Sequence, residues 1–401
     1  MAGIYIHIPF CKKRCFYCDF FSSTNIEVKD SYIEAVCKEL EIRKNYLQNE
    51  NVETIYFGGG TPSQLNVDDF KKIFQTILPL NPLKGTLLQN SELFCSANSP
   101  FRGLGGKEIT LEANPDDLTP EYINSIRILP FNRISVGVQS FNDNELIFLN
   151  RRHNAETAIK AINHLKERGF DNISIDLMYG LPGQNETDWR ETLIQAKALS
   201  VQHISAYHLI YEENTPLYYN LQKGLIRPLE EESSVRLFEI LMDELAESGF
   251  EHYEISNFAK PGYRSKHNAS YWNGTHYLGI GASAHSYNGR SRQWNVSSIS
   301  KYIELVMHPE FSEKQLQNPE SFEIIDEKTA YNEFILTRLR TKEGIELSEL
   351  NFLFGEDRKI HCLRQAQIHL DNHCLELSDD RLSLTKKGIF ISDGIMGDLL
   401  L

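Results

Sequence analysis

The sequence has no run of about 18 consecutive apolar residues, the length that a membrane-spanning helix requires. The first residues, MAGIYIHIPFCKKRC, also lack the basic region, the apolar stretch and the small-residue cleavage site of a secretory signal. We therefore expect a cytoplasmic protein. Its 401 residues, 41% of them hydrophobic, are sufficient for one large domain and one or two smaller ones.

The sequence has no excess of positive charge, since 41 Lys and Arg residues stand against 55 Asp and Glu residues and the formal net charge is -14. Proteins bind nucleic acids largely through Lys and Arg side chains that displace counterions from phosphates. The composition therefore disfavours a nucleic-acid partner.

Seven cysteines do not indicate a disulfide scaffold, because the chain is long and disulfides are rare in the reducing cytoplasm. Four have no spacing typical of a metal site, and we interpret them as ordinary small side chains: Cys37, Cys95, Cys362 and Cys374. The other three, Cys11, Cys15 and Cys18, form a C-x3-C-x2-C pattern. Three thiolates on one short loop can bind three irons of a [4Fe-4S] cluster and leave the fourth iron open. No second Cys or Cys/His pair follows at zinc spacing, so zinc and free thiols are the weaker alternatives.

Short β-branched segments alternate with longer segments of helical periodicity over the first 210 residues, which is the pattern of repeated βα units and a parallel sheet. The six predicted strands are 4–8, 53–57, 108–112, 133–138, 172–177 and 203–209. Capping residues support the helices between them: Asn154 and Gly169 bound one, and Thr119-Pro120 begins another. Six units are too few for a closed eight-stranded barrel. We predict an α/β fold with an open, partial (βα)6 barrel over 1–210, whose ligands bind at the C-terminal ends of the strands.

Three other segments depart from this alternation. Segment 82–107 is much longer than a usual connection, and we predict a flexible insertion there. Segment 211–328 combines a helix at 231–248 with aromatic, Gly-rich stretches, and we expect a substrate-proximal extension. Segment 329–401 is helical and charged and ends in a β-hairpin and a helix at 374–401, which predicts a small, mostly helical accessory domain.

Groups that can bind a ligand follow the predicted strands. A GGGTP run begins at Gly58, directly after the second strand, and glycines there let backbone groups approach a ligand. The ends of the next four strands carry Glu112, Gln139, Asp176 and His208. Each group alone is explained by a tight turn, a helix cap or a solvated loop, but their common location favours a shared pocket.

The cysteine spacing, with the aromatic Tyr17 before the third cysteine, resembles the radical S-adenosylmethionine (SAM) superfamily. The resemblance implies that SAM chelates the open iron through its amino and carboxylate groups, and that the reduced cluster can cleave SAM to a 5'-deoxyadenosyl radical. The GGGTP run resembles the superfamily motif that contacts the methionine end of SAM. No residue is assigned a catalytic role.

Several segments resemble one branch of that superfamily, which contains oxygen-independent coproporphyrinogen III dehydrogenase and related heme chaperones. These segments are YIHIPFCKKRCFYCDF, FGGGTPS, LEANP, ISVGVQSF, LNRRH, IDLMYGLPGQ and HNASYW. The resemblance implies that SAM contacts map onto Tyr5, Tyr17, Gly59, Gly60, Thr61, Glu112, Gln139, Arg151 and Asp176.

Two departures separate the members of this branch. The dehydrogenase pattern adds a fourth cysteine, C-x3-C-x2-C-x-C, where this chain has Asp19 and Phe20, and it normally carries an N-terminal extension. Both departures favour a heme chaperone, and the dehydrogenase, which oxidatively decarboxylates coproporphyrinogen III, is the alternative. Radical modification of RNA is a third hypothesis, which the acidic charge disfavours.

His267 begins the HNASYW segment, which resembles the HNxxYW motif of the chaperones. Its imidazole can serve as an axial ligand of heme iron, with Tyr271 and Trp272 against the macrocycle, and the alternative is a polar loop histidine among core aromatics. The implied cofactors are a [4Fe-4S] cluster, SAM and heme, and the implied partners are acceptor hemoproteins such as respiratory enzymes. The sequence leaves open a homodimer and a peripheral membrane association.

Overall fold

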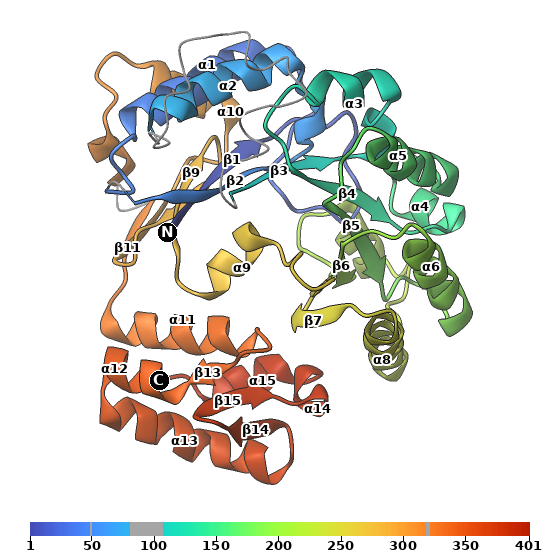
Figure 1. Cartoon of the computed structure of the whole chain (residues 1–401), viewed down its shortest axis with the longest axis vertical. Helices are drawn as coiled ribbons and strands as arrows, with labels where there is room; N and C mark the ends of the chain where they lie inside the picture. Colours follow the sequence, from blue (N-terminus) through green and yellow to red (C-terminus); the bar gives the residue numbers. More distant parts are fainter. Residues whose placement is uncertain (49, 81–106, 318–320) are drawn as a thin grey trace.

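The structure is a computed structural model that describes residues 1–48, 50–80, 107–317 and 321–401 (Figure 1). Apart from Lys107, the predicted insertion at 82–107 lies outside the described residues. No helix of the described residues is long and apolar enough to cross a membrane.

Six parallel strands form the centre of the main sheet, and neighbours in the chain are neighbours in the sheet. They are β1 (Ala2–Ile8), β2 (Val52–Gly59), β3 (Glu108–Ala113), β4 (Arg133–Gln139), β5 (Ile173–Tyr179) and β6 (His203–His208). Each predicted strand matches one of them within two residues at either end. The α/β class and the partial barrel are therefore confirmed.

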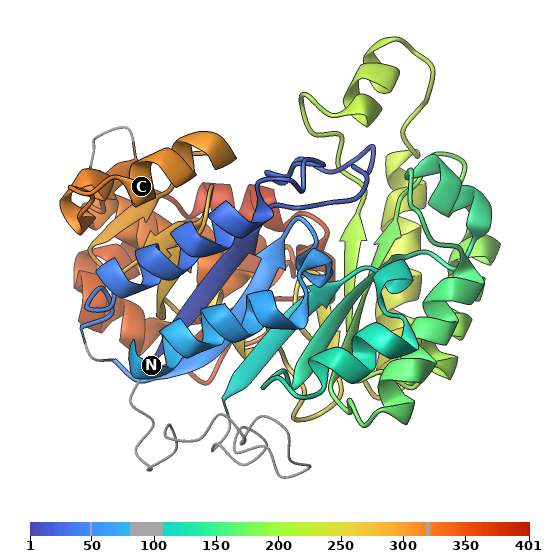
Figure 2. The ribbon, with the colours of Figure 1, turned by 90° about the horizontal axis from the view of Figure 1, so that it is seen from above.

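Most of the helices that follow these strands cover the outer face of the curved sheet (Figures 1 and 2). They are α1 (Lys29–Ile42), α2 (Val67–Leu80), α3 (Pro120–Ile126), α4 (Asp143–Phe148), α5 (Ala155–Glu167), α6 (Glu186–Ala198) and α8 (Glu231–Glu247). Helix α7 (Pro216–Gln222) instead projects away from this layer (Figure 2), and the backbone N–H of its Leu217 donates to the carbonyl of Phe16. Two predicted helix starts are confirmed by side-chain caps, because Thr119 accepts a hydrogen bond from the backbone of Tyr122 and Asn154 accepts one from Thr157.

The segment after β6 widens the sheet at both edges. On one side β8 (Asn257–Ala259) pairs antiparallel with β6, and β7 (Glu251–Glu254) pairs with β8. On the other side β9 (His276–Ile280) runs parallel to β1 and is followed by β10 (His285–Tyr287), β11 (Ser291–Trp294) and β12 (Phe322–Ile324). Within the described ranges, the resulting sheet has 12 strands. Two helices connect this region: α9 (Lys266–Trp272) and α10 (Ile299–Met307).

The C-terminal part of the chain has its own hydrophobic cluster, which runs from Tyr331 to Leu399 (Figure 1). Its elements are α11 (Glu327–Leu339), β13 (Ile345–Glu346), α12 (Leu347–Phe354), α13 (Glu356–Asp371), β14 (Leu375–Ser378), β15 (Arg381–Leu384), α14 (Lys386–Ile389) and α15 (Ser392–Asp398). The predicted hairpin within 374–401 is β14 and β15, which pair antiparallel. The sheet extension, in contrast, shares one core with the barrel, from Ala2 to Phe311.

Candidate functional site

A cavity of about 390 Å³ opens at the C-terminal ends of the barrel strands. Eleven of the residues predicted from the sequence line it: Cys11, Cys15, Cys18, Tyr17, Gly59, Gly60, Thr61, Glu112, Gln139, Arg151 and Asp176. His208, which was predicted at the end of the sixth strand, lines it as well. Tyr5 and His267 are not among its lining residues.

The loop that carries the three cysteines is fixed at several points. The backbone N–H of Cys11 donates to the carbonyl of Ser23 at 2.9 Å, and that of Phe16 donates to the carbonyl of Leu149 at 3.2 Å. Phe16 and Tyr17 pack against a small apolar cluster that includes Leu149 and Met178. The loop is therefore held over the strand ends by both hydrogen bonds and apolar contacts.

The thiols have two polar neighbours in the cavity. Cys11 Sγ lies 3.3 Å from Thr61 Oγ1, and a guanidinium N–H of Arg151 donates to Cys15 Sγ at 3.3 Å. Burial raises the pKa of the Cys18 thiol to about 11 and also raises that of Cys11. Cluster binding must therefore displace protons from these thiols, since the thiolate is the ligand.

Among the described residues, no group of three or more His, Cys, Asp or Glu side chains converges on a point that a single metal ion can occupy. Such convergence is not required for a cluster, because each thiolate binds a different iron. Three thiols on one loop, beside a cavity lined by polar groups, fit a [4Fe-4S] cluster with an open iron.

The three glycines at the end of β2, of which Gly60 directly follows the strand, bring the backbone close to other groups. A Cβ on Gly60 would lie 2.8 Å from the carbonyl carbon of Pro9, and one on Gly58 would lie 3.0 Å from Glu112 Oε1. Gly59 has a φ of +107°, which L side chains rarely adopt. Close contacts with other protein groups therefore restrict side chains at these positions, and the approach of a ligand to this backbone stays a prediction.

Two half-buried carboxyl groups, those of Glu112 and Asp176, line the cavity. Glu112 accepts hydrogen bonds from the Tyr56 hydroxyl at 2.7 Å and from the backbone N–H of Gly59 at 3.2 Å. Burial raises the pKa of Glu112 to about 7 and that of Asp176 to about 6. Both are therefore acceptors whose charge is poorly solvated, as expected for groups that bind a cationic ligand.

Arg151 is half-buried beside these groups and links three parts of the site. Its Nη2 donates to Asn114 Oδ1 and to the carbonyl of Gly137, both at 2.6 Å, while its Nε has no partner among the described residues. Gln139 has a φ of +67°, a left-handed conformation that costs energy for a residue other than glycine. Strain of this kind is often found at ligand sites.

Sequence reasoning did not single out some residues of the cavity, including Asn114, Ser135 and Tyr207. Ser135 lies opposite Glu112 in the β3–β4 register, and its hydroxyl donates to Asp176 at 3.4 Å. The alternation of side chains along a strand is the signal that identifies such positions: counting by two back from Gln139 along β4 reaches Ser135, and counting by two forward from Glu112 reaches Asn114.

His267 lies at the other end of the barrel, on α9, and is 1% exposed. Its Nδ1 is 2.8 Å from the Thr54 hydroxyl and its Nε2 is 2.9 Å from the Tyr271 hydroxyl. Burial lowers its pKa to about 3, so the ring is neutral. Because both ring nitrogens have protein partners, an axial heme role requires one of these hydrogen bonds to break. The segment is a helix, whereas the alternative interpretation placed the histidine in a loop.

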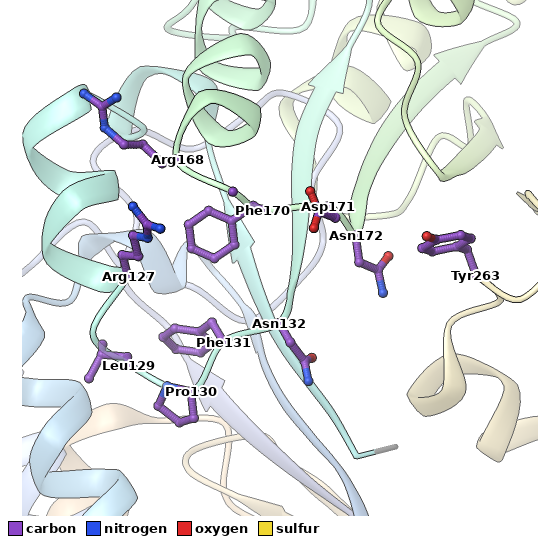
Figure 3. A pocket seen from close by; sticks show the side chains of 11 residues that line it. Arg127, Leu129, Pro130, Phe131, Asn132, Arg168, Phe170, Asp171, Asn172 and Tyr263 are labelled. Atoms are coloured by element: carbon purple, nitrogen blue, oxygen red, sulfur yellow. The ribbon is translucent and has the colours of Figure 1, made fainter. Parts of the chain in front are cut away.

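A second cavity, of about 350 Å³, lies at the N-terminal ends of β4 and β5 (Figure 3). Its walls include Arg127, Phe131, Phe170 and Tyr263. None of the site residues predicted from the sequence lines it. Parallel barrels bind their ligands at the opposite, C-terminal ends of the strands, so the cysteine-lined cavity is the candidate site.

The fold and the cysteine-lined cavity define a radical SAM protein, and comparisons with known proteins agree. Residues 5–196 match the model of the radical SAM superfamily, and residues 325–391 match that of the HemN C-terminal domain. The chain is 32% identical over 403 residues to the heme chaperone HemW of Bacillus subtilis (strain 168), covering 100% of this chain and 99% of that protein. It is also 32% identical over 404 residues to HemW of Lactococcus lactis subsp. lactis (strain IL1403), covering 99% and 97% of the two chains. The protein belongs to the HemW family.

The solved structure of coproporphyrinogen III oxidase (HemN) from Escherichia coli has the same fold. It superposes with a TM-score of 0.79 over 99% of this chain and 89% of that one, at 21% sequence identity. At this identity the likeness concerns the fold and not the activity.

Proposed function

We propose that this protein binds heme and delivers it to acceptor hemoproteins, such as respiratory enzymes, and that it uses a [4Fe-4S] cluster and SAM to do so. The full-length similarity to proteins named heme chaperone HemW carries the proposal. The residues after the third cysteine support the proposal. The dehydrogenase pattern places a fourth cysteine two residues after the third, and this chain has Asp19 and Phe20 after Cys18 instead.

Cys11, Cys15 and Cys18 would hold the cluster, and SAM would bind beside it in the same cavity. When bound, the reduced cluster supplies an electron that can cleave the sulfonium bond of SAM. Glu112 is placed to accept a hydrogen bond from a cationic amino group, and Gly59 and Gly60 offer space for the methionine part. The Arg151 guanidinium, whose Nε has no partner within the part of the chain that the structure describes, is placed to bind a carboxylate or hydroxyl of the same ligand.

Of the remaining residues predicted to contact SAM, four line the cavity and one does not. Tyr17, Thr61, Gln139 and Asp176 line the cavity and are proposed as direct contacts. Tyr5 is not a lining residue, and its hydroxyl lies 3.1 Å from His7 Nδ1. We propose that Tyr5 acts by packing against residues of the site rather than by direct contact with SAM.

His267 stays a proposed heme ligand only in a conformation that differs from the one described, because both of its ring nitrogens are bonded. Its neutral ring is chemically able to bind iron. The heme site is therefore the part of the proposal that most requires a direct test.

The decisive experiment uses anaerobically reconstituted protein with about four iron per chain. We expect it to bind about one heme per chain and to transfer that heme to an apo-hemoprotein, observed as the growth of the acceptor's Soret band. We also expect no conversion of coproporphyrinogen III in the presence of SAM and reductant. Turnover of coproporphyrinogen III above about 1 per second would replace the chaperone with the dehydrogenase.

A further inference from the structure

Helix α9 closes the N-terminal end of the barrel. The carboxylate of Glu108, at the start of β3, accepts the backbone N–H groups of Lys266 and His267, each at 3.0 Å. A carboxylate at this place satisfies helix N–H groups that have no partner within the helix. The N-terminus of α9 is therefore fixed to the inside of the barrel, where it places His267 among the strand side chains.

The imidazole of His267 packs directly on Tyr56. The two rings are nearly parallel, with an interplanar angle of 22° and centroids 4.9 Å apart. Gly3 is the neighbour that allows this position, because a Cβ there would lie 3.3 Å from the imidazole and 2.9 Å from the Thr54 hydroxyl. The ring of His267 is thus held by packing as well as by its hydrogen bonds to Thr54 and Tyr271.

Tyr56 in turn reaches the candidate SAM site. Its hydroxyl donates to Glu112 Oε1 at 2.7 Å, and the other oxygen of Glu112 accepts the N–H of Gly59 at 3.2 Å. A continuous set of contacts therefore leads from His267 to the glycine run that lines the cavity. Each of these contacts is between buried or half-buried groups, where hydrogen bonds are strong and alternative partners are few.

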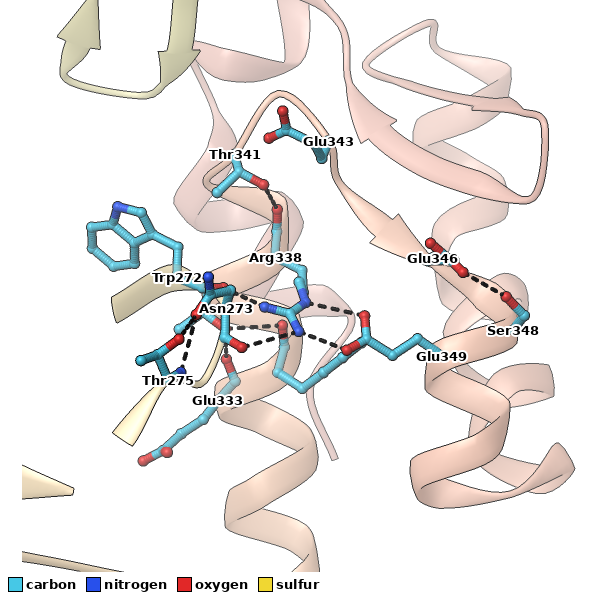
Figure 4. Close-up of polar contacts among 12 residues, drawn as sticks. Trp272, Asn273, Thr275, Glu333, Arg338, Thr341, Glu343, Glu346, Ser348 and Glu349 are labelled. Carbon is cyan, nitrogen blue, oxygen red and sulfur yellow. Dashed lines mark hydrogen bonds and ion pairs between the residues drawn. The ribbon is translucent and has the colours of Figure 1, made fainter. Parts of the chain in front are cut away.

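The opposite end of α9 is held by the C-terminal domain (Figure 4). Arg338 donates to the carbonyl of Trp272 at 2.6 Å and to that of Asn273 at 3.4 Å, and it pairs with Glu349 at 2.7 Å. Arg340 lies over the Trp272 ring, 4.8 Å from its centroid. With both ends fixed, α9 has little freedom to move away from Tyr56.

We propose that His267 is a positioning residue for SAM: by packing beneath Tyr56 it keeps the Tyr56 hydroxyl on Glu112 and so keeps Glu112 in place at the glycine run. The proposal rests on the proposed SAM site. It gives the first residue of the HNxxYW segment a role that needs no contact with heme. Removal of the ring leaves a cavity under Tyr56, into which that side chain can tilt and lose Glu112.

The test is a double-mutant cycle on SAM affinity, measured by equilibrium dialysis with anaerobically reconstituted protein. We expect His267→Ala and Tyr56→Phe each to weaken SAM binding about tenfold, and the double variant to be weakened about tenfold rather than about 100-fold. Non-additivity is the signature of action through a shared contact. Iron content is measured on every variant and should stay unchanged.

His203→Ala is the matched control. His203 is equally buried, and its two ring nitrogens are bonded to Ser174 at 2.7 Å and to Tyr253 at 2.8 Å, but it does not stack on Tyr56. We expect this variant to lose thermal stability to a similar extent and to keep the SAM affinity of the wild type. His267→Phe, which retains a flat ring and has no iron ligand, should recover most of the SAM affinity.

Three results would overturn the inference: an unchanged SAM affinity in His267→Ala, losses that multiply in the double variant, or an equal loss in His203→Ala. If His267→Ala fails to retain the cluster, Gly3→Ala replaces it in the cycle, since the added methyl presses on the same ring. A wild-type protein that holds a full cluster and does not bind SAM contradicts the proposed function instead, so the two failures are distinguishable.

Discussion

Glu112 should make the stability of the protein depend on pH. Its pKa is raised from 4.5 to about 7, mainly by burial, so the unfolded chain releases this proton at a lower pH than the folded protein does. The folded state therefore loses stability as pH rises from the unfolded pKa through the folded one. Between about pH 6 and about pH 8, linkage gives a loss of about 1.3 kcal/mol from Glu112. Asp176, with a pKa of about 6, adds only about 0.4 kcal/mol in this window.

Glu112→Gln removes the larger of these two contributions. The amide keeps one oxygen that can accept a hydrogen bond from Tyr56 or Gly59. At a single pH the substitution therefore changes both the hydrogen bonding and the cost of burying a charge. The change in unfolding free energy between two pH values isolates the titration of the carboxyl group. We expect the stability of the variant relative to wild type to increase by about 1.3 kcal/mol from about pH 6 to about pH 8. The assay is anaerobic urea unfolding of SAM-free protein, followed by tryptophan fluorescence at both pH values.

Glu121→Gln is the control for this prediction. Glu121 is an exposed carboxyl in the first turn of α3, and its pKa is lowered by hydrogen bonds, so it is ionised throughout this window in both states. The control should follow the wild type at both pH values. A constant difference between Glu112→Gln and wild type would refute the reasoning that Glu112 is a buried carboxyl with a raised pKa.

Further predictions concern the cluster and the attachment of the sheet extension. Alanine at any one of the three cysteines of the C-x3-C-x2-C motif should abolish the absorbance near about 400 nm and lower the iron content, whereas Cys37→Ala, on α1, should retain both. Glu39→Ala should destabilise the protein by about 3–5 kcal/mol in urea unfolding, because it leaves the buried Arg43 charge unpaired. Arg338→Ala should weaken SAM binding less than His267→Ala does, since it releases only the far end of α9.

The barrel was predictable because its determinants are local. Buried parallel strands such as β4 and β5 are rich in β-branched and apolar residues, and the helices between strands begin at capping residues such as Asn154. Ends of parallel strands meet at one edge of a sheet, so a list of polar groups at those ends predicts most of a pocket. For that reason eleven predicted residues line a single cavity.

The widening of the sheet was not predictable by the same reasoning. The short strands β8 and β9 form by pairing with the two edge strands of the barrel, β6 and β1. These partners lie far away from them in the sequence. One contributor is the buried pair of Glu39 and Arg43 on α1, in which Arg43 donates to the carbonyl of Gly279 on β9 at 2.9 Å. A sequence shows that both residues are charged, but not that they share a buried site.

The burial of His267 could not be inferred from the sequence for a related reason. Its partners Thr54 and Tyr56 are more than 200 residues away in the chain, and α9 has only 7 residues. A helix this short has no periodicity from which a buried face can be inferred. The motif resemblance identified the residue, and only the tertiary contacts reveal that its ring nitrogens are both engaged.

These contacts lead to a linkage prediction about heme and SAM. Coordination of heme iron by His267 must break a hydrogen bond to Thr54 or Tyr271 and move the ring away from Tyr56. Leaving one buried hydroxyl without a partner costs about 1–3 kcal/mol, and the same movement releases Glu112. If His267 binds heme iron, heme must therefore weaken SAM binding, and SAM must weaken heme binding by the same factor.

The prediction is that two observations occur together or not at all: a Soret band that changes in His267→Ala, and antagonism between heme and SAM in the wild type. The measurements are the heme spectrum of the wild type and the variant, and SAM dialysis with and without saturating heme. A Soret change without antagonism would contradict the geometry of α9, because it would mean that the ring can reach iron while Tyr56 and Glu112 stay in place. Antagonism without a Soret change would show that heme occupies the cysteine-lined cavity itself and that its axial ligand is a different residue.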